Sequence, residues 1–131
     1  MITLTKPDGA PINIDPALVL RVRRTIAGER QEKKARTRID WVDMQLVQEP
    51  IDEVAPLIKA VLSTFTVVTS RDGSPIWFNG KEAVGPLPLT LIQDDGIIRS
   101  AIKLMGYRQY VTETPDEVRT ILGNACGTVL P

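Results

Sequence analysis

The sequence predicts an α+β fold made of two tandem repeats, each with a β-hairpin, further strands and a closing helix, packed as one pseudo-two-fold domain. Two observations predict it. Residues 1–58 align with residues 65–122 at one constant offset and without a gap. A T-x-x-D-G-x-P-I pattern opens both halves, and a Q-x-V-x-E-x-x-D-E-V pattern follows later in both. Because these identities cluster where a strand turns and where a helix begins, they indicate duplicated architecture.

The repeats set the expected domain limits. Residues 1–64 form the first repeat and residues 65–123 the second, together one compact domain. Residues 124–131 form a tail that we expect to be partly disordered, because it is terminal and ends in proline. A chain of 131 residues is long enough to bury one such core.

Composition narrows the function classes. Sixteen basic and sixteen acidic residues cancel, so no global charge draws the chain to nucleic acid or to a membrane. The single cysteine, Cys126, excludes an internal disulfide and fits a reducing compartment. No run of about 18 apolar residues is present, so we expect a cytoplasmic protein without a membrane span.

Period-two alternation predicts the strands. Residues 2–5 alternate apolar and polar side chains before an Asp-Gly pair, and a second Asp-Gly pair follows residues 67–68. Because Asp-Gly supplies the positive φ of a tight turn, we expect a β-hairpin at the start of each half. Further strands are expected over residues 39–47 and 107–111.

Two helices are expected between the hairpins and the closing elements. In residues 28–38, two glutamates stand four positions before a lysine and an arginine, the favourable order for helical ion pairs, and this predicts a short surface helix. Residues 95–105 carry an apolar stripe at helical spacing that ends at Gly106, and this predicts a more buried helix.

Each half closes with a helix. Thr114, Pro115 and Glu117 suit the N-cap, first-turn and N3 positions of a capping box. In the first half, the apolar residues at helical spacing predict this buried face: Val54, Leu57, Ile58, Val61 and Leu62. Pro56 interrupts that pattern, so we expect an irregular first turn or a helix that restarts near Ala55.

Catalytic chemistry has no recognisable signature in the chain. It contains no histidine, no Gly-rich phosphate loop and no dinucleotide fingerprint, so we expect no enzyme and no cofactor. Acidic residues near the start of each closing helix could hold a metal, but first-turn carboxylates also cap helices, and capping is the preferred interpretation. The residues concerned are Glu49, Asp52, Glu53, Glu113, Asp116 and Glu117.

A basic run is the one local feature that suggests a binding surface. It holds eight basic residues against Glu29 and Glu32, a local charge of +6: Arg21, Arg23, Arg24, Arg30, Lys33, Lys34, Arg36 and Arg38. A polar helix of this kind either stays solvated with internal ion pairs or meets an acidic partner or a phosphate backbone. The second half has no such run, which indicates an addition to the duplicated scaffold.

The first half also resembles a known family. The matching residues are Met1, Ile2, Leu4, Thr5, Gly9, Ile14, Pro16, Leu18, Val47, Glu49, Glu53 and Val54. They are similar to the I-x-L-T, glycine-turn, L-N-P and V-x-E-x-x-x-E-V layout of the short flagellar and swarming-motility accessory proteins of bacteria, with Asp15 in place of the asparagine. The resemblance covers residues 1–58 and, through the repeat, residues 65–122. It implies a non-enzymatic role that supports motility or a related cell-surface process.

We therefore expect a binding or adaptor module whose contact surface is the basic run, with an acidic protein as its partner. The alternative is a regulator that binds RNA or DNA through the same side chains, and the opening strand and turn are also similar to those of the RNA-binding carbon-storage regulators. The third hypothesis is an enzyme of unknown class. The sequence leaves the partner and the oligomeric state open.

Overall fold

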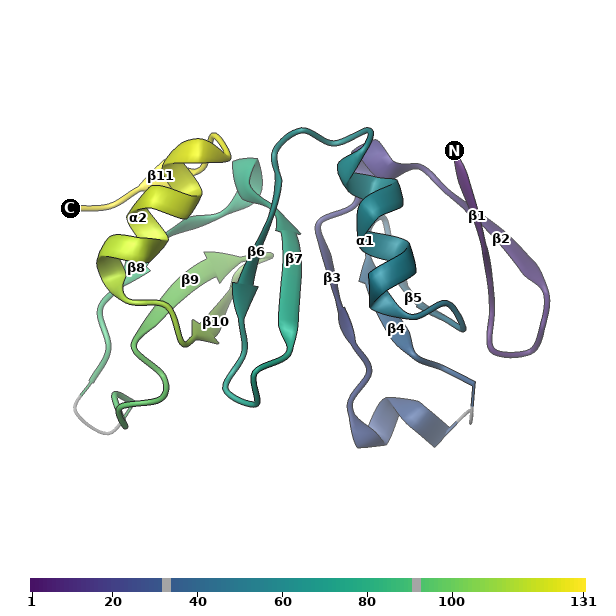
Figure 1. The fold of residues 1–131 in the computed structure, drawn as a ribbon, viewed down its shortest axis with the longest axis horizontal. Coiled ribbons are helices and arrows are strands. Elements are labelled where there is room, and N and C mark those ends of the chain that lie inside the picture. The colour runs from purple at the N-terminus through teal and green to yellow at the C-terminus, as the bar shows by residue number, and fades with distance from the viewer. Residues whose placement is uncertain (32–33, 91–92) are drawn as a thin grey trace. The chain divides into compact units, whose positions relative to one another are not determined.

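The computed structural model describes residues 1–31, 34–90 and 93–131. The chain divides into two compact units, Met1–Ser63 and Thr64–Pro131. Each unit combines β-sheet with one α-helix, so the predicted α+β class is confirmed (Figure 1). The pseudo-two-fold packing of the halves stays a prediction.

Unit 1 is a hairpin, a three-stranded antiparallel meander and a helix. Its elements are β1 (Ile2–Thr5), β2 (Pro11–Ile14), the 3-10 helices η1 (Pro16–Leu18) and η2 (Ala27–Gln31), β3 (Arg21–Arg24), β4 (Thr37–Asp40), β5 (Met44–Val47) and α1 (Ile51–Lys59). β1 pairs with β2, and β4 pairs with both β3 and β5. α1 packs against β3.

Unit 2 has a similar succession of elements, but its described residues hold no counterpart of η2, and a further strand is added after the helix. Its elements are β6 (Phe65–Thr69), β7 (Pro75–Asn79), the 3-10 helix η3 (Gly80–Glu82), β8 (Val84–Leu87), β9 (Ser100–Leu104), β10 (Tyr107–Val111), α2 (Pro115–Asn124) and β11 (Thr128–Val129). β6 and β7 form a hairpin, and a second sheet has the order β10-β9-β8-β11. α2 packs against β8 and β11 (Figure 1).

Both predicted hairpins are confirmed. In the first turn Gly9 has φ +94° and donates its N–H to the Lys6 carbonyl at 2.9 Å. In the second, Gly73 has φ +87° and donates to the Ser70 carbonyl at 3.0 Å. Residues with a side chain rarely adopt such φ values, so the glycine of each Asp-Gly pair allows the backbone conformation that the turn requires.

Of the two helices predicted between the blocks, the first is largely wrong and the second is wrong. In the first, residues 28–31 belong to the 3-10 helix η2, residues 32–33 lie outside the described residues, and β4 begins at Thr37; in the second, residues 95–105 contain β9. Gly106 (φ +78°) and Met105 (φ +54°) both have positive φ and form the two-residue turn of the β9–β10 hairpin. Positive φ at a glycine suits a hairpin turn as well as a helix end, and cross-strand pairing outweighs helical spacing here.

The strand predicted over residues 39–47 is two strands. β4 ends at Asp40, β5 begins at Met44, and the Trp41 N–H donates to the Asp43 carbonyl at 2.9 Å within the turn.

The constant offset between the halves is lost over their middle strands. β3 begins one residue further from η1 than β8 does from η3, so equivalent strands there are offset by one residue less. The β9–β10 hairpin is one residue longer than the β4–β5 hairpin, and this restores the original offset before the closing helices.

The closing helices fit the predictions in part. Thr114 caps α2, where its Oγ1 accepts from the Glu117 N–H at 3.3 Å and the Glu117 carboxylate accepts from the Thr114 N–H at 3.0 Å. Pro56 stands inside α1 without ending it. The buried face of α1 is corrected: Ile51, Val54, Ala55 and Ile58 are buried, whereas Leu57 and Val61 are 44% and 62% exposed. α1 ends at Lys59, before Val61 could join that face.

Equivalent positions supply the core of each unit. The buried pairs at the constant offset are Leu4 and Val68, Ile14 and Phe78, Val19 and Ala83, Val47 and Val111, Val54 and Val118, and Ile58 and Leu122. Each pair keeps an apolar side chain, because burial of apolar surface is the main stabilising term for either unit.

The tail prediction is also corrected. Within residues 124–131, β11 pairs in parallel with β8, and the Leu130 N–H donates to the Gly85 carbonyl at 2.7 Å. This pairing satisfies backbone groups of the tail and fixes it to the sheet. Across the described parts of the chain, no helix is both long enough and apolar enough to cross a bilayer.

Candidate functional site: an arginine-lined hollow in unit 1

The predicted basic surface divides into two groups in the structure. Arg21, Arg23 and Arg38 lie half-buried on β3 and β4, whereas Arg24, Arg30 and Arg36 are exposed. Lys34 is exposed in the same segment, and Lys33 lies outside the described residues. The two groups face different electrostatic surroundings, so they cannot contribute equally to one contact surface.

The first group forms an ion-pair ladder of five residues. Its ion pairs are Arg21–Asp40 at 2.9 Å, Asp40–Arg38 at 3.0 Å, Arg38–Glu29 at 2.8 Å and Glu29–Arg23 at 2.8 Å. The five side chains are between 10% and 26% exposed. Three arginines thus share two carboxylates, and most of their charge is neutralised within unit 1.

Burial and the ion pairs shift the pKa values of Glu29, Arg38 and Arg21. Burial opposes ionisation of Glu29, but hydrogen bonds from Arg23, the Ile26 N–H and Arg38 outweigh it and lower the pKa of Glu29 to about 2. Burial also disfavours the charged form of Arg38, yet Glu29 and Asp40 raise its pKa overall. For Arg21, burial outweighs the attraction of Asp40 and lowers the pKa.

The second group lines a hollow of about 340 Å³, called here the basic hollow. Its lining residues are Arg24, Thr25, Arg30, Ala35, Arg36, Pro50, Ile51 and Asp52. Arg30 is anchored, because its Nη2 donates to the Thr25 carbonyl at 2.8 Å and its Nε donates to the Thr25 Oγ1 at 3.4 Å. Within residues 1–31, 34–90 and 93–131, none of the three arginines has an ion pair with a carboxylate.

Strand alternation explains why the arginines separate. Successive side chains of a strand point to opposite faces, so Arg21 and Arg23 share one face of β3 while Val22 and Arg24 share the other. Val22 is fully buried and pairs with Ile39, on the face covered by α1. Arg24 continues that row beyond the core and reaches the basic hollow beside the start of α1.

The same end of unit 1 is held together by hydrogen bonds. Arg24 stands opposite Thr37 in the β3–β4 register, and the Thr37 Oγ1 donates to the Glu49 carbonyl at 2.6 Å. Buried Thr25 donates its Oγ1 to the Ala35 carbonyl at 3.0 Å. These bonds tie together the segments that carry the lining residues of the basic hollow.

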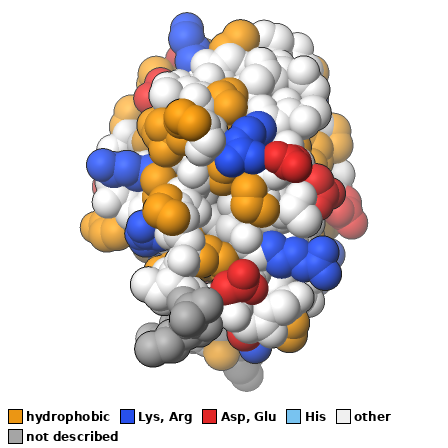
Figure 2. All heavy atoms as spheres, turned by 90° about the vertical axis from the view of Figure 1, so that its left-hand side faces the viewer, with side chains coloured by type: hydrophobic (Ala, Val, Ile, Leu, Met, Phe, Trp, Pro, Cys, Tyr) orange, Lys and Arg blue, Asp and Glu red, His pale blue; other side chains and the backbone are white. Residues whose placement is uncertain are grey.

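The described residues of unit 2 lack this arrangement. Arg99 takes the backbone place of Arg36, because the Arg36 N–H donates to the Val47 carbonyl at the end of β5 and the Arg99 N–H donates to the Val111 carbonyl at the end of β10. β8 ends with Leu87 where β3 ends with Arg24. The face of unit 2 in Figure 2 mixes both signs of charge with apolar side chains.

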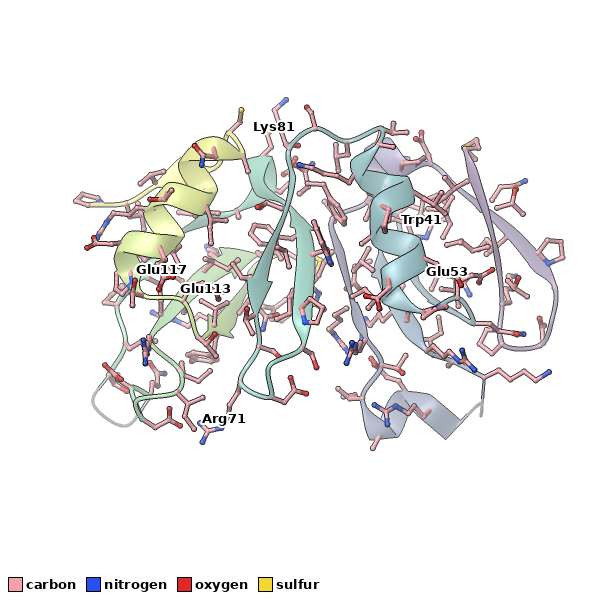
Figure 3. All side chains as sticks on the ribbon, in the orientation of Figure 1. Trp41, Glu53, Arg71, Lys81, Glu113 and Glu117 are labelled. Atoms are coloured by element: carbon pink, nitrogen blue, oxygen red, sulfur yellow. The ribbon has the colours of Figure 1, made fainter. Side chains whose placement is uncertain are left out.

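Glu49 and Glu113, which precede the closing helices, have equivalent structural roles. The Glu49 carboxylate accepts from the N–H and the Oγ1 of Thr5, both at 2.9 Å. Glu113 does the same with Thr69, again at 2.9 Å for both bonds (Figure 3). These clamps tie the hairpin of each unit to the segment before its helix. Among the described residues, no three acidic or cysteine side chains gather as a metal ion would require.

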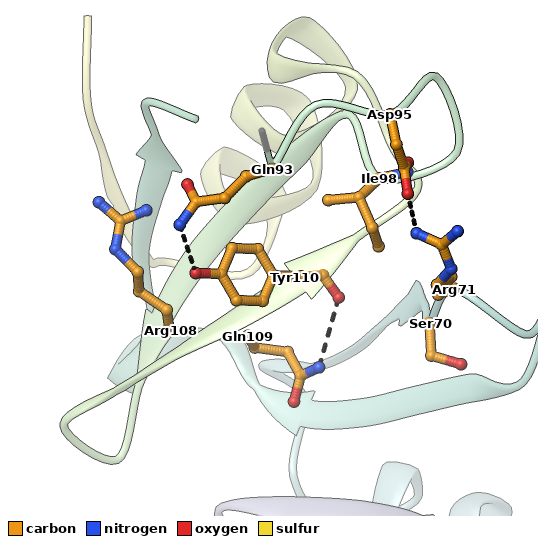
Figure 4. A pocket seen from close by; sticks show the side chains of 8 residues that line it. All are labelled: Ser70, Arg71, Gln93, Asp95, Ile98, Arg108, Gln109 and Tyr110. Atoms are coloured by element: carbon orange, nitrogen blue, oxygen red, sulfur yellow. Dashed lines mark hydrogen bonds and ion pairs between the residues drawn. The ribbon is translucent and has the colours of Figure 1, made fainter. Parts of the chain in front are cut away.

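A second hollow lies in unit 2, and no pattern in the sequence predicted it. It measures about 560 Å³ and is lined by Ser70, Arg71, Gln93, Asp95, Ile98, Arg108, Gln109 and Tyr110. Figure 4 shows Tyr110 in its middle, with its Oη accepting from the Gln93 Nε2 at 2.9 Å. Arg71 forms an ion pair with Asp95. Among the described lining residues, Arg108 alone then carries a charge without an ion pair, and it donates to the Pro88 carbonyl, so the unit 2 hollow presents less unpaired charge than the basic hollow.

Comparison with known proteins adds no identity: no family model, no curated protein and no solved structure matches this chain.

Proposed function

We propose that the protein is a non-enzymatic binding module that holds a partner with an acidic surface through the basic hollow. The observation that carries the proposal is the contrast between neighbouring arginines. Arg21, Arg23 and Arg38 are neutralised in the ion-pair ladder, whereas Arg24, Arg30 and Arg36 surround a hollow without a carboxylate partner in the described part of the chain. Exposed like charges placed together favour an anionic partner.

The chemistry available supports binding rather than catalysis. The whole chain contains no histidine, so the usual proton carrier near neutral pH is missing. The arginines of the basic hollow keep their positive charge at physiological pH and serve as hydrogen-bond donors. Donors with a permanent charge suit recognition of an anion better than proton transfer.

A protein partner is favoured over nucleic acid by the size of the basic surface. A phosphate backbone presents a charge about every 1.7 Å along duplex DNA, and proteins that follow it use an extended positive surface. Here the three arginines of the basic hollow lie at one end of unit 1, and exposed Lys34 belongs to the same segment of the chain. That restricted extent suits a local cluster of acidic side chains.

Binding of labelled probes tests the proposal. The probes are a glutamate-rich peptide, a single-stranded RNA and a duplex DNA, each titrated at several salt concentrations. The double variant Arg24→Gln/Arg36→Gln removes two cations whose side chains form no hydrogen bond or ion pair among the described residues. The matched control, Lys81→Gln/Lys103→Gln, removes two exposed cations of unit 2. We expect only the first pair to weaken peptide binding, with unchanged thermal melting in both.

Two outcomes would contradict the proposal. Equal peptide binding by wild type and Arg24→Gln/Arg36→Gln would remove the basic hollow as the contact surface. RNA or DNA binding that is tighter than peptide binding and falls steeply with salt would instead favour a nucleic-acid regulator. The process that the binding serves is proposed from the sequence resemblance alone, as motility or a related cell-surface process.

A further inference from the structure

We propose that the basic hollow recognises a phosphorylated side chain of the partner, a phosphomonoester. The inference rests on the proposed function and names the chemical group that the hollow accepts. Among the described residues, three guanidinium groups and one carboxylate, that of Asp52, line the hollow and leave a charge of +2. A phosphomonoester carries about −1.5 to −2 at pH 7, so it balances this charge, whereas one carboxylate balances half of it.

The donors also fit the group. A guanidinium presents a planar fork of N–H donors that matches the oxygens of a phosphate in bidentate contacts. Arg24 and Arg36 have no side-chain hydrogen bond or ion pair among the described residues, so their forks are available. Three such groups around one space can serve several phosphate oxygens together, which a planar carboxylate cannot offer.

The Arg30 side chain is preorganised for binding in the basic hollow. Its Nη2 and Nε are held by the carbonyl and Oγ1 of Thr25, and Thr25 is only 3% exposed. Because Thr25 in turn donates to the Ala35 carbonyl, the anchor belongs to the folded core of unit 1. A side chain that is already ordered loses less conformational entropy when a ligand binds.

Asp52 offsets only one of the three positive charges and forms no ion pair with these arginines among the described residues. The carboxylates of Glu29 and Asp40 are engaged in the ion-pair ladder. The arginines of the basic hollow thus repel one another until an anion enters. A dianion removes that repulsion most completely.

The test uses three glutamate-rich peptides that differ at one central residue, which is serine, glutamate or phosphoserine. We expect the phosphoserine peptide to bind wild-type protein about tenfold more tightly than the serine peptide, from the added charge-assisted hydrogen bonds. In Arg24→Gln/Arg36→Gln the three peptides should bind alike, while Lys81→Gln/Lys103→Gln should keep the preference. The preference should also weaken from pH 7.5 to pH 5, as the phosphate loses its second charge.

The outcomes separate this inference from the proposed function. If all three peptides bind with equal affinity and the binding still requires Arg24 and Arg36, the phosphate inference is wrong and the acidic-partner proposal stands. If inorganic phosphate alone binds as tightly as the phosphoserine peptide, the source is free phosphate and the inference about the partner is wrong. If no peptide binds, both proposals fail. Unchanged thermal melting of each variant shows that a lost preference is not lost folding.

Discussion

Replacement of Glu29 by glutamine should destabilise unit 1 in a pH-dependent way. The Glu29 carboxylate accepts from Arg23 at 2.8 and 2.9 Å, from Arg38 at 2.8 Å and from the Ile26 N–H at 3.0 Å. A neutral amide keeps one acceptor oxygen and leaves Arg23 and Arg38, which face each other in the β3–β4 register, without a shared carboxylate. Like charges directly opposite one another across two strands are destabilising.

The expected loss in the free energy of unfolding follows from the pKa shift of Glu29. Its pKa falls from 4.5 to about 2 in the folded protein, and a shift of that size corresponds to an upper limit of about 3 kcal/mol. Solvent reaches the partly exposed arginines and screens the interaction, so we expect a loss of roughly 1–2 kcal/mol at pH 7. The folded pKa lies below the unfolded value, so this stabilisation is present above about pH 4.5 and disappears as the pH falls to about 2.

Urea unfolding of wild type and Glu29→Gln between pH 7 and pH 2.5 measures this effect. The difference in the free energy of unfolding should shrink over the lower part of that range. Glu82→Gln is the control, because Glu82 is exposed in η3 of unit 2 and should change stability by less than about 0.5 kcal/mol. A difference that stays constant down to pH 2.5, or one no larger than the control's, would refute the role assigned to Glu29.

Three further stability predictions can be checked by urea unfolding at pH 7. Glu49→Gln and Glu113→Gln each weaken an equivalent clamp, so both should cost about 1–3 kcal/mol and by similar amounts, and a cost in only one unit would contradict the equivalence. Thr114→Ala removes the N-cap of α2 and should cost about 1 kcal/mol, and no loss would show that the capping box is dispensable. Pro56→Ala restores a helical N–H in α1 and should stabilise by up to about 3 kcal/mol, whereas a net loss would mean that the proline is needed.

The parts of the fold that sequence reasoning predicted depend on local chemistry. The hairpin turns follow from the positive φ of Gly9 and Gly73, and the start of α2 follows from Thr114 and Glu117, which lie three residues apart. These features depend on residues that are close in the sequence and not on contacts with distant ones. The internal similarity then extended each prediction from one half to the other.

The middle of each half could not be predicted, because there the same residues suit a helix and a strand. Glu29 stands four residues before Lys33, yet its carboxylate binds Arg23 and Arg38, partners set by the register of β3 and β4. A helical ion pair contributes about 0.2–0.5 kcal/mol, less than the pairing of two strands. The choice between them depends on contacts that a local pattern does not contain.

The candidate site could be predicted only in part, because its geometry also depends on contacts between distant residues. The sequence identified the basic run, but the separation of Arg23 from Arg24 depends on which face of β3 each side chain occupies. The contribution of residues 50–52 to the basic hollow depends on the packing of α1 against β3. Neither spacing nor composition carries that information.

The most direct test of the central claim is an NMR titration of the arginine side chains with the glutamate-rich peptide. We predict saturable shifts of the Nε–Hε signals of Arg24, Arg30 and Arg36, while the corresponding signals of Arg21 and Arg23 in the ion-pair ladder change little. Shifts confined to Arg71 and the other residues of the unit 2 hollow, or an unchanged spectrum at saturating peptide, would contradict the account.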